Sequence, residues 1–215
     1  QLMNRFGVDR AMAAFAARAA QGHIGRARAL ATDEQARLKR NEILDIPTRI
    51  GTVSACYEIA GSIVANANDQ ADRIIAPLEM QDEKDVRMAF GEGAEGKGFK
   101  SIERAIKREM KDLEDRFKKR RRRIVADEYD RILLDLTGYF RDVLVVQAGS
   151  TAPLINEELR PAIERYAQGS DSAATLRRID ALRESRDQLI ANVAPMAVFE
   201  SLLVTLRDPR LVAIN

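Results

Sequence analysis

Residues 101–137 contain neither glycine nor proline, and this uninterrupted stretch constrains the fold more than any other feature of the chain. Apolar side chains recur through it every three or four residues and continue to Leu144, which is the period of one helix face. Opposite charges four residues apart, as in Arg108 with Asp112 and Glu114 with Lys118, support a helix on its outer side. We therefore expect one very long helix, or two helices with a shallow joint.

The remaining segments also show the helical period, and we find no pair of strands and no internal repeat. The chain is therefore expected to be all-α. The first expected helix is capped by Asp9 and stops at Gly22, and the helical pattern restarts near Ile24. A capping box at Thr32–Gln35 opens the next helix, which ends before Pro47. A longer helix is expected from Thr48 to Phe90 with a kink at Pro77, and further helices are expected over 157–168, 172–192 and 195–206. The four glycines of Gly91 to Gly98 predict a loop.

Composition excludes several classes of protein. Apolar residues make up 46% and charged residues 32%, and the net charge is only +2, so any attraction to nucleic acid must come from a local patch. The single cysteine, Cys56, excludes an internal disulfide, and the single histidine, His23, argues against a metal site. No apolar run is long enough to cross a membrane and no signal peptide opens the chain, so we expect a cytoplasmic protein. Because the sequence begins with Gln1, we expect it to be a piece of a longer protein.

Catalytic motifs are missing from the sequence. No phosphate-binding loop of the GxxxxGK[ST] type occurs, and one histidine and one cysteine do not build a nucleophilic triad. The carboxylates lie among paired charges on helix faces. We therefore expect no catalytic residue, no metal and no cofactor, and we interpret His23 and Cys56 as packing or surface residues.

A run of six cations interrupts the long helix. Its members are Lys118, Lys119, Arg120, Arg121, Arg122 and Arg123. At about 100° per residue they encircle a helix, so Arg120 or Arg121 must fall on the apolar stripe. Either the stripe is uncovered there, or the helix protrudes, or acidic partners meet the arginine. The run is a candidate contact patch for nucleic acid or an acidic protein, or it is a solvated helix end; the absence of interleaved aromatics argues against stacking on single strands.

The segment GHIGRARAL, Gly22 to Leu30, places two glycines before a helix, close to arginines. Such a turn can present backbone N–H groups to a phosphate, or it can simply join two helices. The residues alone favour the joint.

Four segments together resemble the delta-prime subunits of bacterial DNA polymerase III clamp loaders. AARAAQGHIGRARALATD, ending at Asp33, is similar to the helical lid of an AAA+ module at the sensor-2 position. TGYFRDVLVVQAG, the LIN at Leu154 to Asn156, and RDQLIANVAPMAVFESLLVTL, from Arg186 to Leu206, resemble the C-terminal domain of those subunits. The resemblance implies an AAA+ lid over residues 1–46 and a helical-bundle collar domain over 47–215, with the nucleotide-binding core preceding Gln1.

The same resemblance bears on the glycine turn. In ATP-hydrolysing relatives the lid reads Gly-x-x-Arg-x-Ala, and the arginine approaches the phosphates. Aligned on Gly22 and Ala27, that position here is Gly25, and Arg26 comes one residue later, which turns it by about 100°. The resemblance therefore implies an inactive sensor-2 turn.

The function implied is a non-catalytic assembly module of the replisome. It would join the gamma/tau ATPase subunits and the delta subunit in a ring that loads the sliding clamp on primed DNA. The last helix carries more apolar surface than one internal face needs, so its side chains are the expected collar interface: Met196, Phe199, Leu202, Leu203 and Leu206. The alternative from another class is a stand-alone helical nucleic-acid-binding protein that uses residues 118–123.

Overall fold

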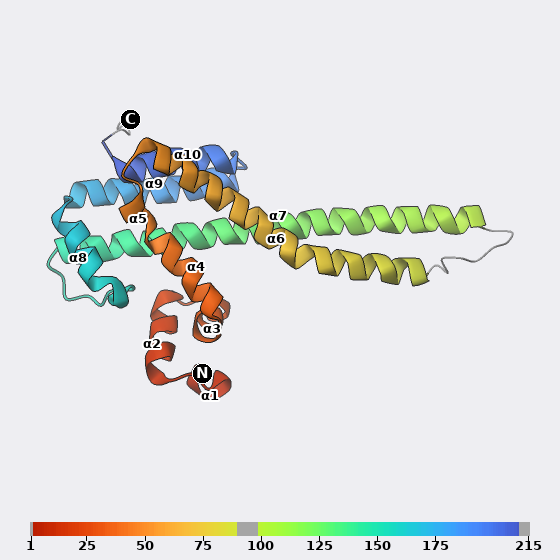
Figure 1. The fold of residues 1–215 in the computed structure, drawn as a ribbon, viewed down its shortest axis with the longest axis horizontal. Helices are drawn as coiled ribbons and strands as arrows, with labels where there is room; N and C mark the ends of the chain where they lie inside the picture. The colour runs from red at the N-terminus through yellow and green to blue at the C-terminus, as the bar shows by residue number, and fades with distance from the viewer. Residues whose placement is uncertain (1, 90–98, 211–215) are drawn as a thin grey trace. The chain divides into compact units, whose positions relative to one another are not determined.

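The computed structural model describes residues 2–89 and 99–210, and no strand occurs among them, so the all-α class is confirmed. The helices are α1 (Leu2–Phe6), α2 (Arg10–Ala19), α3 (Ile24–Thr32), α4 (Glu34–Leu44), α5 (Ile46–Arg49), α6 (Val53–Ala89), α7 (Phe99–Gln147), the 3₁₀ turn η1 (Glu157–Leu159), α8 (Arg160–Gln168), α9 (Ser172–Ile190) and α10 (Pro195–Arg207) (Figure 1). The loop expected at Gly91 to Gly98 lies outside the described residues.

The two longest helices follow directly from the sequence pattern. The long glycine- and proline-free stretch forms one helix, α7, of 49 residues rather than two. Helix α6, of 37 residues, runs through Pro77 without ending there. The carbonyl that loses its helical donor belongs to Arg73, four residues earlier, and Arg73 and Pro77 are both exposed, so water can bond to it.

Side-chain caps set several of the helix ends. The cap expected at Asp9 is confirmed, because its Oδ1 accepts a hydrogen bond from the Met12 amide at 2.8 Å. The capping box expected from Thr32 is wrong by one residue. Helix α3 continues to Thr32, whose hydroxyl donates to the Arg28 carbonyl, and Asp33 caps α4 by accepting from the Gln35 amide at 2.8 Å.

The chain forms two compact units. Unit 1 comprises residues 1–61 and 130–215, and unit 2 comprises 62–129. The boundary expected between residues 46 and 47 falls inside unit 1. Ile46 and Pro47 are buried, so the chain crosses this point within a packed interior rather than as an exposed linker.

Unit 1 has two packed regions. In the first, α1 to α4 surround a small cluster in which Ala16, Ala19 and Leu30 are buried. In the second, residues from the end of α7 and from α8 to α10 form the interior: Leu136, Tyr139, Phe140, Val143, Ile163, Leu182, Val198, Phe199, Leu202, Leu203 and Leu206. Three of its rings meet edge to face, with centroids 5.4–5.8 Å apart: Tyr139, Phe140 and Tyr166. Small alanines therefore allow close packing in one region, and large side chains fill the other.

Unit 2 is built from α6 and α7, which pack side by side. Ile75 of α6 is buried against Leu113 and Phe117 of α7, and partly buried side chains extend the contact: Leu78, Val86, Met110 and Ile124. The apolar stripe read from the sequence of α7 is thus covered by α6 along this stretch.

Candidate functional site

The glycine turn joins α2 to α3 through a left-handed backbone. Gln21 and Gly22 have φ values of 48° and 89°, and the second lies where only glycine fits without strain. His23 then caps α3, because its Nδ1 accepts a hydrogen bond from the Arg26 amide at 3.1 Å. One of the free backbone donors that a phosphate would need is therefore already bonded to a side chain.

The side chain of Arg26 extends from this turn toward α7 within unit 1. Its guanidinium donates to Asp135 of α7, and only 10% and 1% of the two side chains are exposed. Burial lowers the pKa of Arg26 and raises the pKa of Asp135, because the loss of water outweighs the attraction between the two groups. Arg26 thus serves as an internal ion-pair partner.

Gly25, the position that the resemblance would align with a sensor-2 arginine, is exposed. A Cβ atom here would lie 3.2 Å from Cε1 of His23, so any side chain would crowd the ring that caps α3. Glycine at this position is therefore compatible with the cap and supplies no cation.

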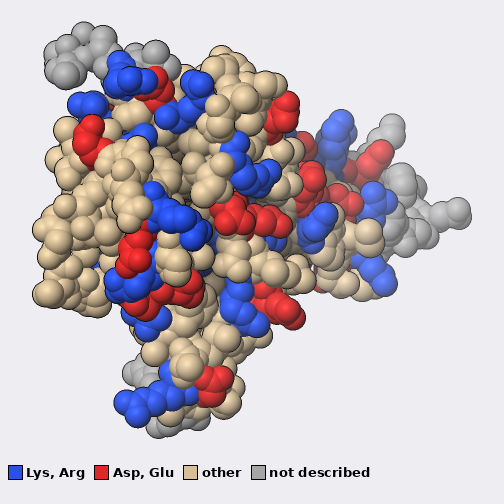
Figure 2. Space-filling model, turned by 60° about the vertical axis from the view of Figure 1, so that its left-hand side comes forward, with Lys and Arg blue, Asp and Glu red and all other residues tan. Residues whose placement is uncertain are grey.

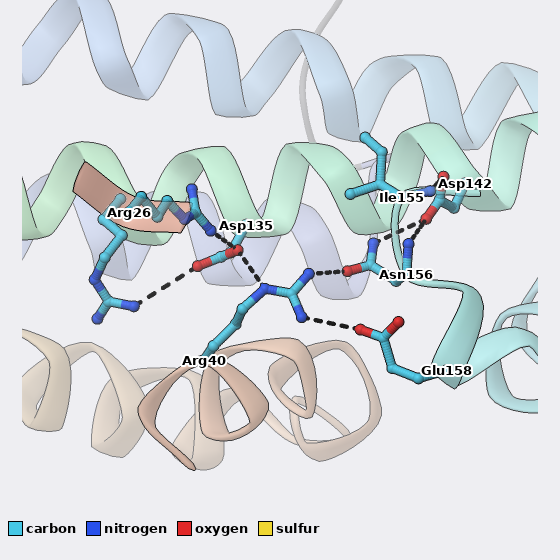
Figure 3. A network of polar contacts seen from close by, with 8 residues as sticks. Arg26, Arg40, Asp135, Asp142, Ile155, Asn156 and Glu158 are labelled. Atoms are coloured by element: carbon cyan, nitrogen blue, oxygen red, sulfur yellow. Dashed lines mark hydrogen bonds and ion pairs between the residues drawn. The ribbon is translucent and has the colours of Figure 1, made fainter. Parts of the chain in front are cut away.

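A second arginine makes the central contacts of the site. Arg40 of α4 has 1% of its side chain exposed, and its Nε donates to Oδ1 of Asp135 at 3.1 Å. Nη1 donates to Glu158 at 3.1 Å, and Nη2 donates to Oδ1 of Asn156. Asp135 therefore lies between Arg26 and Arg40, as Figure 3 shows.

Asn156 connects this arginine to a second buried carboxylate on α7. Both its backbone amide and its side-chain amide donate to Oδ2 of Asp142, at 2.7 and 2.8 Å, and the Ile155 amide donates to Oδ1 at 3.0 Å (Figure 3). We call the set Arg26, Arg40, Asp135, Asp142, Asn156 and Glu158 the buried polar network. The network joins α3, α4, α7 and the segment before α8, and its hydrogen bonds and ion pairs therefore hold these elements in one arrangement.

Sequence reasoning missed this network. A signal was available: Asp135 and Asp142 are one heptad apart and stand among the apolar residues of α7, and Arg40 lies one turn before the buried Leu44. Charges on an apolar face need partners, but the partners of Arg40 lie 95 to 118 residues away along the chain, and those of Asp142 lie in the segment that follows α7.

The basic run lies on α7 in unit 2, and only some of its six cations form ion pairs with the described residues. Arg121 makes a two-pronged contact with Asp72 of α6, at 2.6 and 3.0 Å, and also donates to Asn68 at 3.1 Å. Lys118 pairs with Glu114 at 2.6 Å. For Arg121, an acidic partner is therefore the explanation that holds among the three offered for an arginine on the stripe.

The other four cations of the run are exposed and make no ion pair with residues 2–89 or 99–210: Lys119, Arg120, Arg122 and Arg123. Arg120 lies at a surface pocket of about 350 Å³, whose lining also includes Asp82, Asp85 and Phe117. Elsewhere charges of both signs are interspersed, as the face in Figure 2 shows.

The expected collar interface needs correction. Phe199, Leu202, Leu203 and Leu206 are at most 2% exposed, because α10 packs against α9 and the interior of unit 1. Only Met196, at 39%, reaches the surface. The apolar excess of α10 is therefore used within the chain and is not available to a neighbour in this structure.

His23 and Cys56, the single histidine and the single cysteine of the chain, both occupy positions that serve the fold. His23 caps a helix, and Cys56 is buried with its Sγ 3.5 Å from the Leu203 carbonyl, where burial raises the pKa of the thiol. Within the described part of the chain, no three histidine, cysteine or carboxylate side chains gather as a metal site would require. No helix of that part is long and apolar enough to cross a membrane.

In comparisons with known protein families, curated proteins and solved structures, nothing matches this chain.

Proposed function

We propose that this chain is a non-catalytic assembly module of a clamp-loader complex. Its role is to join gamma/tau ATPase subunits and a delta subunit, so that the complete machine places the sliding clamp on primed DNA. The observation that carries the proposal is the contact between Arg26 and Asp135. It assigns the arginine beside the sensor-2 position to a structural role, as a module without nucleotide chemistry requires.

The buried polar network supports the same role. Through Arg40 it ties α4 both to α7 and to the Asn156–Glu158 segment before α8. Charged groups that are buried and mutually bonded fix one arrangement, because every alternative leaves a charge without a partner. A module that holds subunits in a ring needs this rigidity between its lid-like and bundle regions.

The surface that meets a neighbour must then lie outside the buried face of α10. Apolar residues are exposed where α9 turns into α10: Ile190 is 74% exposed, Val193 43% and Met196 39%. We call these three residues the α9–α10 corner. Gly61 of α6 lies beside it, since a Cβ there would be 3.8 Å from Cε of Met196. Exposed apolar side chains gathered in this way are typical of a protein–protein contact.

Size-exclusion chromatography with light scattering tests the proposal. The chain is measured alone and after mixing with purified gamma/tau and delta subunits. We expect a hetero-oligomer of defined mass, and we expect the triple variant Ile190→Asp, Val193→Asp, Met196→Asp to weaken it at least tenfold. Leu176→Asp, at an exposed apolar position of α9, is the control and should leave assembly unchanged. A chain that remains monomeric in every mixture contradicts the proposal.

A further inference from the structure

The exposed cations of α7 extend beyond the run 118–123. Arg104, Arg108, Lys111, Lys119 and Arg122 follow one another by three, four or eight residues, so they share one face of the helix. All five are exposed. We call them the basic stripe. At 1.5 Å per residue it is about 27 Å long.

The basic stripe lies on the side of α7 that faces away from α6. Leu113 and Phe117 are buried against Ile75 of α6, and the stripe positions are turned by roughly half a revolution from them. One acid, Asp115, stands in the stripe between Lys111 and Lys119. The face therefore carries five positive charges against one negative charge.

None of the five cations is used to hold unit 2 together. No ion pair joins any of them to a residue within 2–89 or 99–210, whereas the neighbouring Arg121 and Lys118 are both paired. Like charges three or four residues apart on a helix repel one another, which costs folding free energy, and Asp115 offsets only part of this repulsion. A polyanion laid along the row would relieve that repulsion.

The composition of the stripe distinguishes among polyanions. No apolar or aromatic side chain occupies the stripe positions themselves, so the stripe lacks the anchors that protein interfaces bury and the apolar face that a membrane-bound helix inserts. It also lacks rings on which single-stranded bases stack. Cations alone, spread over a rigid helix, fit the phosphates of a nucleic-acid duplex.

We propose that the basic stripe of α7 binds the phosphate backbone of duplex DNA without reading its sequence. The stripe residues belong to unit 2, whereas the residues of the buried polar network and of the α9–α10 corner belong to unit 1, and the inference does not depend on the assembly proposal.

Fluorescence anisotropy with a labelled duplex of about 20 base pairs, titrated with the whole chain at several salt concentrations, tests this. The stripe variant is Arg104→Gln, Arg108→Gln, Lys119→Gln, Arg122→Gln. The matched control removes four exposed cations elsewhere: Arg10→Gln, Arg49→Gln, Lys84→Gln, Arg183→Gln. Both variants change the net charge equally, and circular dichroism checks that both remain helical.

We expect the chain to bind and the stripe variant to bind at least tenfold more weakly at low salt, with its log–log salt slope reduced by about 3 to 4. The control should lose no more than about threefold, as expected of long-range charge alone. Arg121 is left intact in both variants, so the contact between α6 and α7 is unchanged.

Three results would overturn the inference. The first is no binding by the unaltered chain at low salt. The second is equal loss in both variants, which would mean attraction by net charge alone. The third is displacement of the duplex by polyglutamate as readily as by unlabelled duplex at equal charge concentration, which would point to an acidic protein as the partner.

Discussion

A single side chain, that of Arg40, connects three segments of the chain to α4. It donates to Asp135, Asn156 and Glu158 while only 1% of the side chain is exposed. Because a guanidinium presents several donors in a fixed plane, it can bond three acceptors from three segments at once. Lysine at this position could not reproduce that geometry.

Replacing Arg40 by methionine should destabilise unit 1 by about 3–5 kcal/mol, because Asp135 would lose a buried partner and keep its charge. Urea unfolding followed by circular dichroism measures the change. Adding Asp135→Leu to Arg40→Met should not recover the loss, since the second substitution leaves the mostly buried Arg26 guanidinium without the carboxylate to which it donates.

The control for this prediction is Glu158→Gln. The Glu158 side chain is 33% exposed, so its charge is partly screened and its loss should cost no more than about 1 kcal/mol. If Arg40→Met were as mild as Glu158→Gln, the network would not have the structural role described.

Helix α7 belongs to both units, and the share of its surface that is buried differs between them. In unit 2 its apolar stripe is narrow and is completed by Arg121, which pairs with Asp72 through Nε and Nη2 and donates to Asn68 through Nη1. In unit 1 it is buried on several sides and carries Asp135 and Asp142. One uninterrupted helix can serve both settings because only its side chains differ.

The contact between Asp72 and Arg121 should depend on pH. The hydrogen bond from Arg121 lowers the pKa of Asp72 below its ordinary value of 3.8, so folding favours the ionised carboxylate. The stabilisation is present above pH 3.8 and is lost as the pH falls through the lower pKa of the folded state.

Thermal unfolding of Asp72→Asn measures this dependence. The variant should melt below the unaltered chain at neutral pH, and the difference should shrink as the pH drops under 3.8. Asp69→Asn, at an exposed acid of the same helix, is the control and should show a smaller difference at neutral pH. A gap that stays constant into acid would contradict the assignment.

At the scale of the molecule, α10 closes the interior of unit 1. Arg178 of α9 donates to the Leu206 carbonyl at 2.7 Å, and its guanidinium lies over the rings of Phe140 and Tyr166. The last helix is thus held by packing and by a cation that bonds its C-terminal carbonyl. Its apolar residues stabilise the fold itself.

Substitutions on α10 should separate folding from assembly. Phe199→Ala should destabilise the chain by about 3–5 kcal/mol, because it opens a cavity in the interior. Met196→Ala should cost less than about 1 kcal/mol, since its side chain is 39% exposed. Chemical denaturation of both variants checks this, and equal losses would show that Met196 also belongs to the core.

Local sequence signals are enough to predict the long helices. Their period, the punctuation by glycine and proline, and caps such as Asp9 act over a few residues, whereas the short helices α1 and α5 were not predicted and the helix expected from Thr48 begins at Val53. The error at Thr32 and Asp33 is of one residue, where two competent capping side chains stand next to each other.

The roles of the charged and apolar residues that stand out in the sequence depend on the folded structure. The sequence singled out Arg26, the run 118–123 and the face of α10, but not that Arg26 meets Asp135, that Arg121 meets Asp72, or that α10 is buried. These outcomes depend on partners tens of residues away. A local pattern shows that a charge or an apolar side chain needs a partner, whereas the choice of partner is made by packing between distant segments, because solvation and pairing energies depend on which groups the fold brings together.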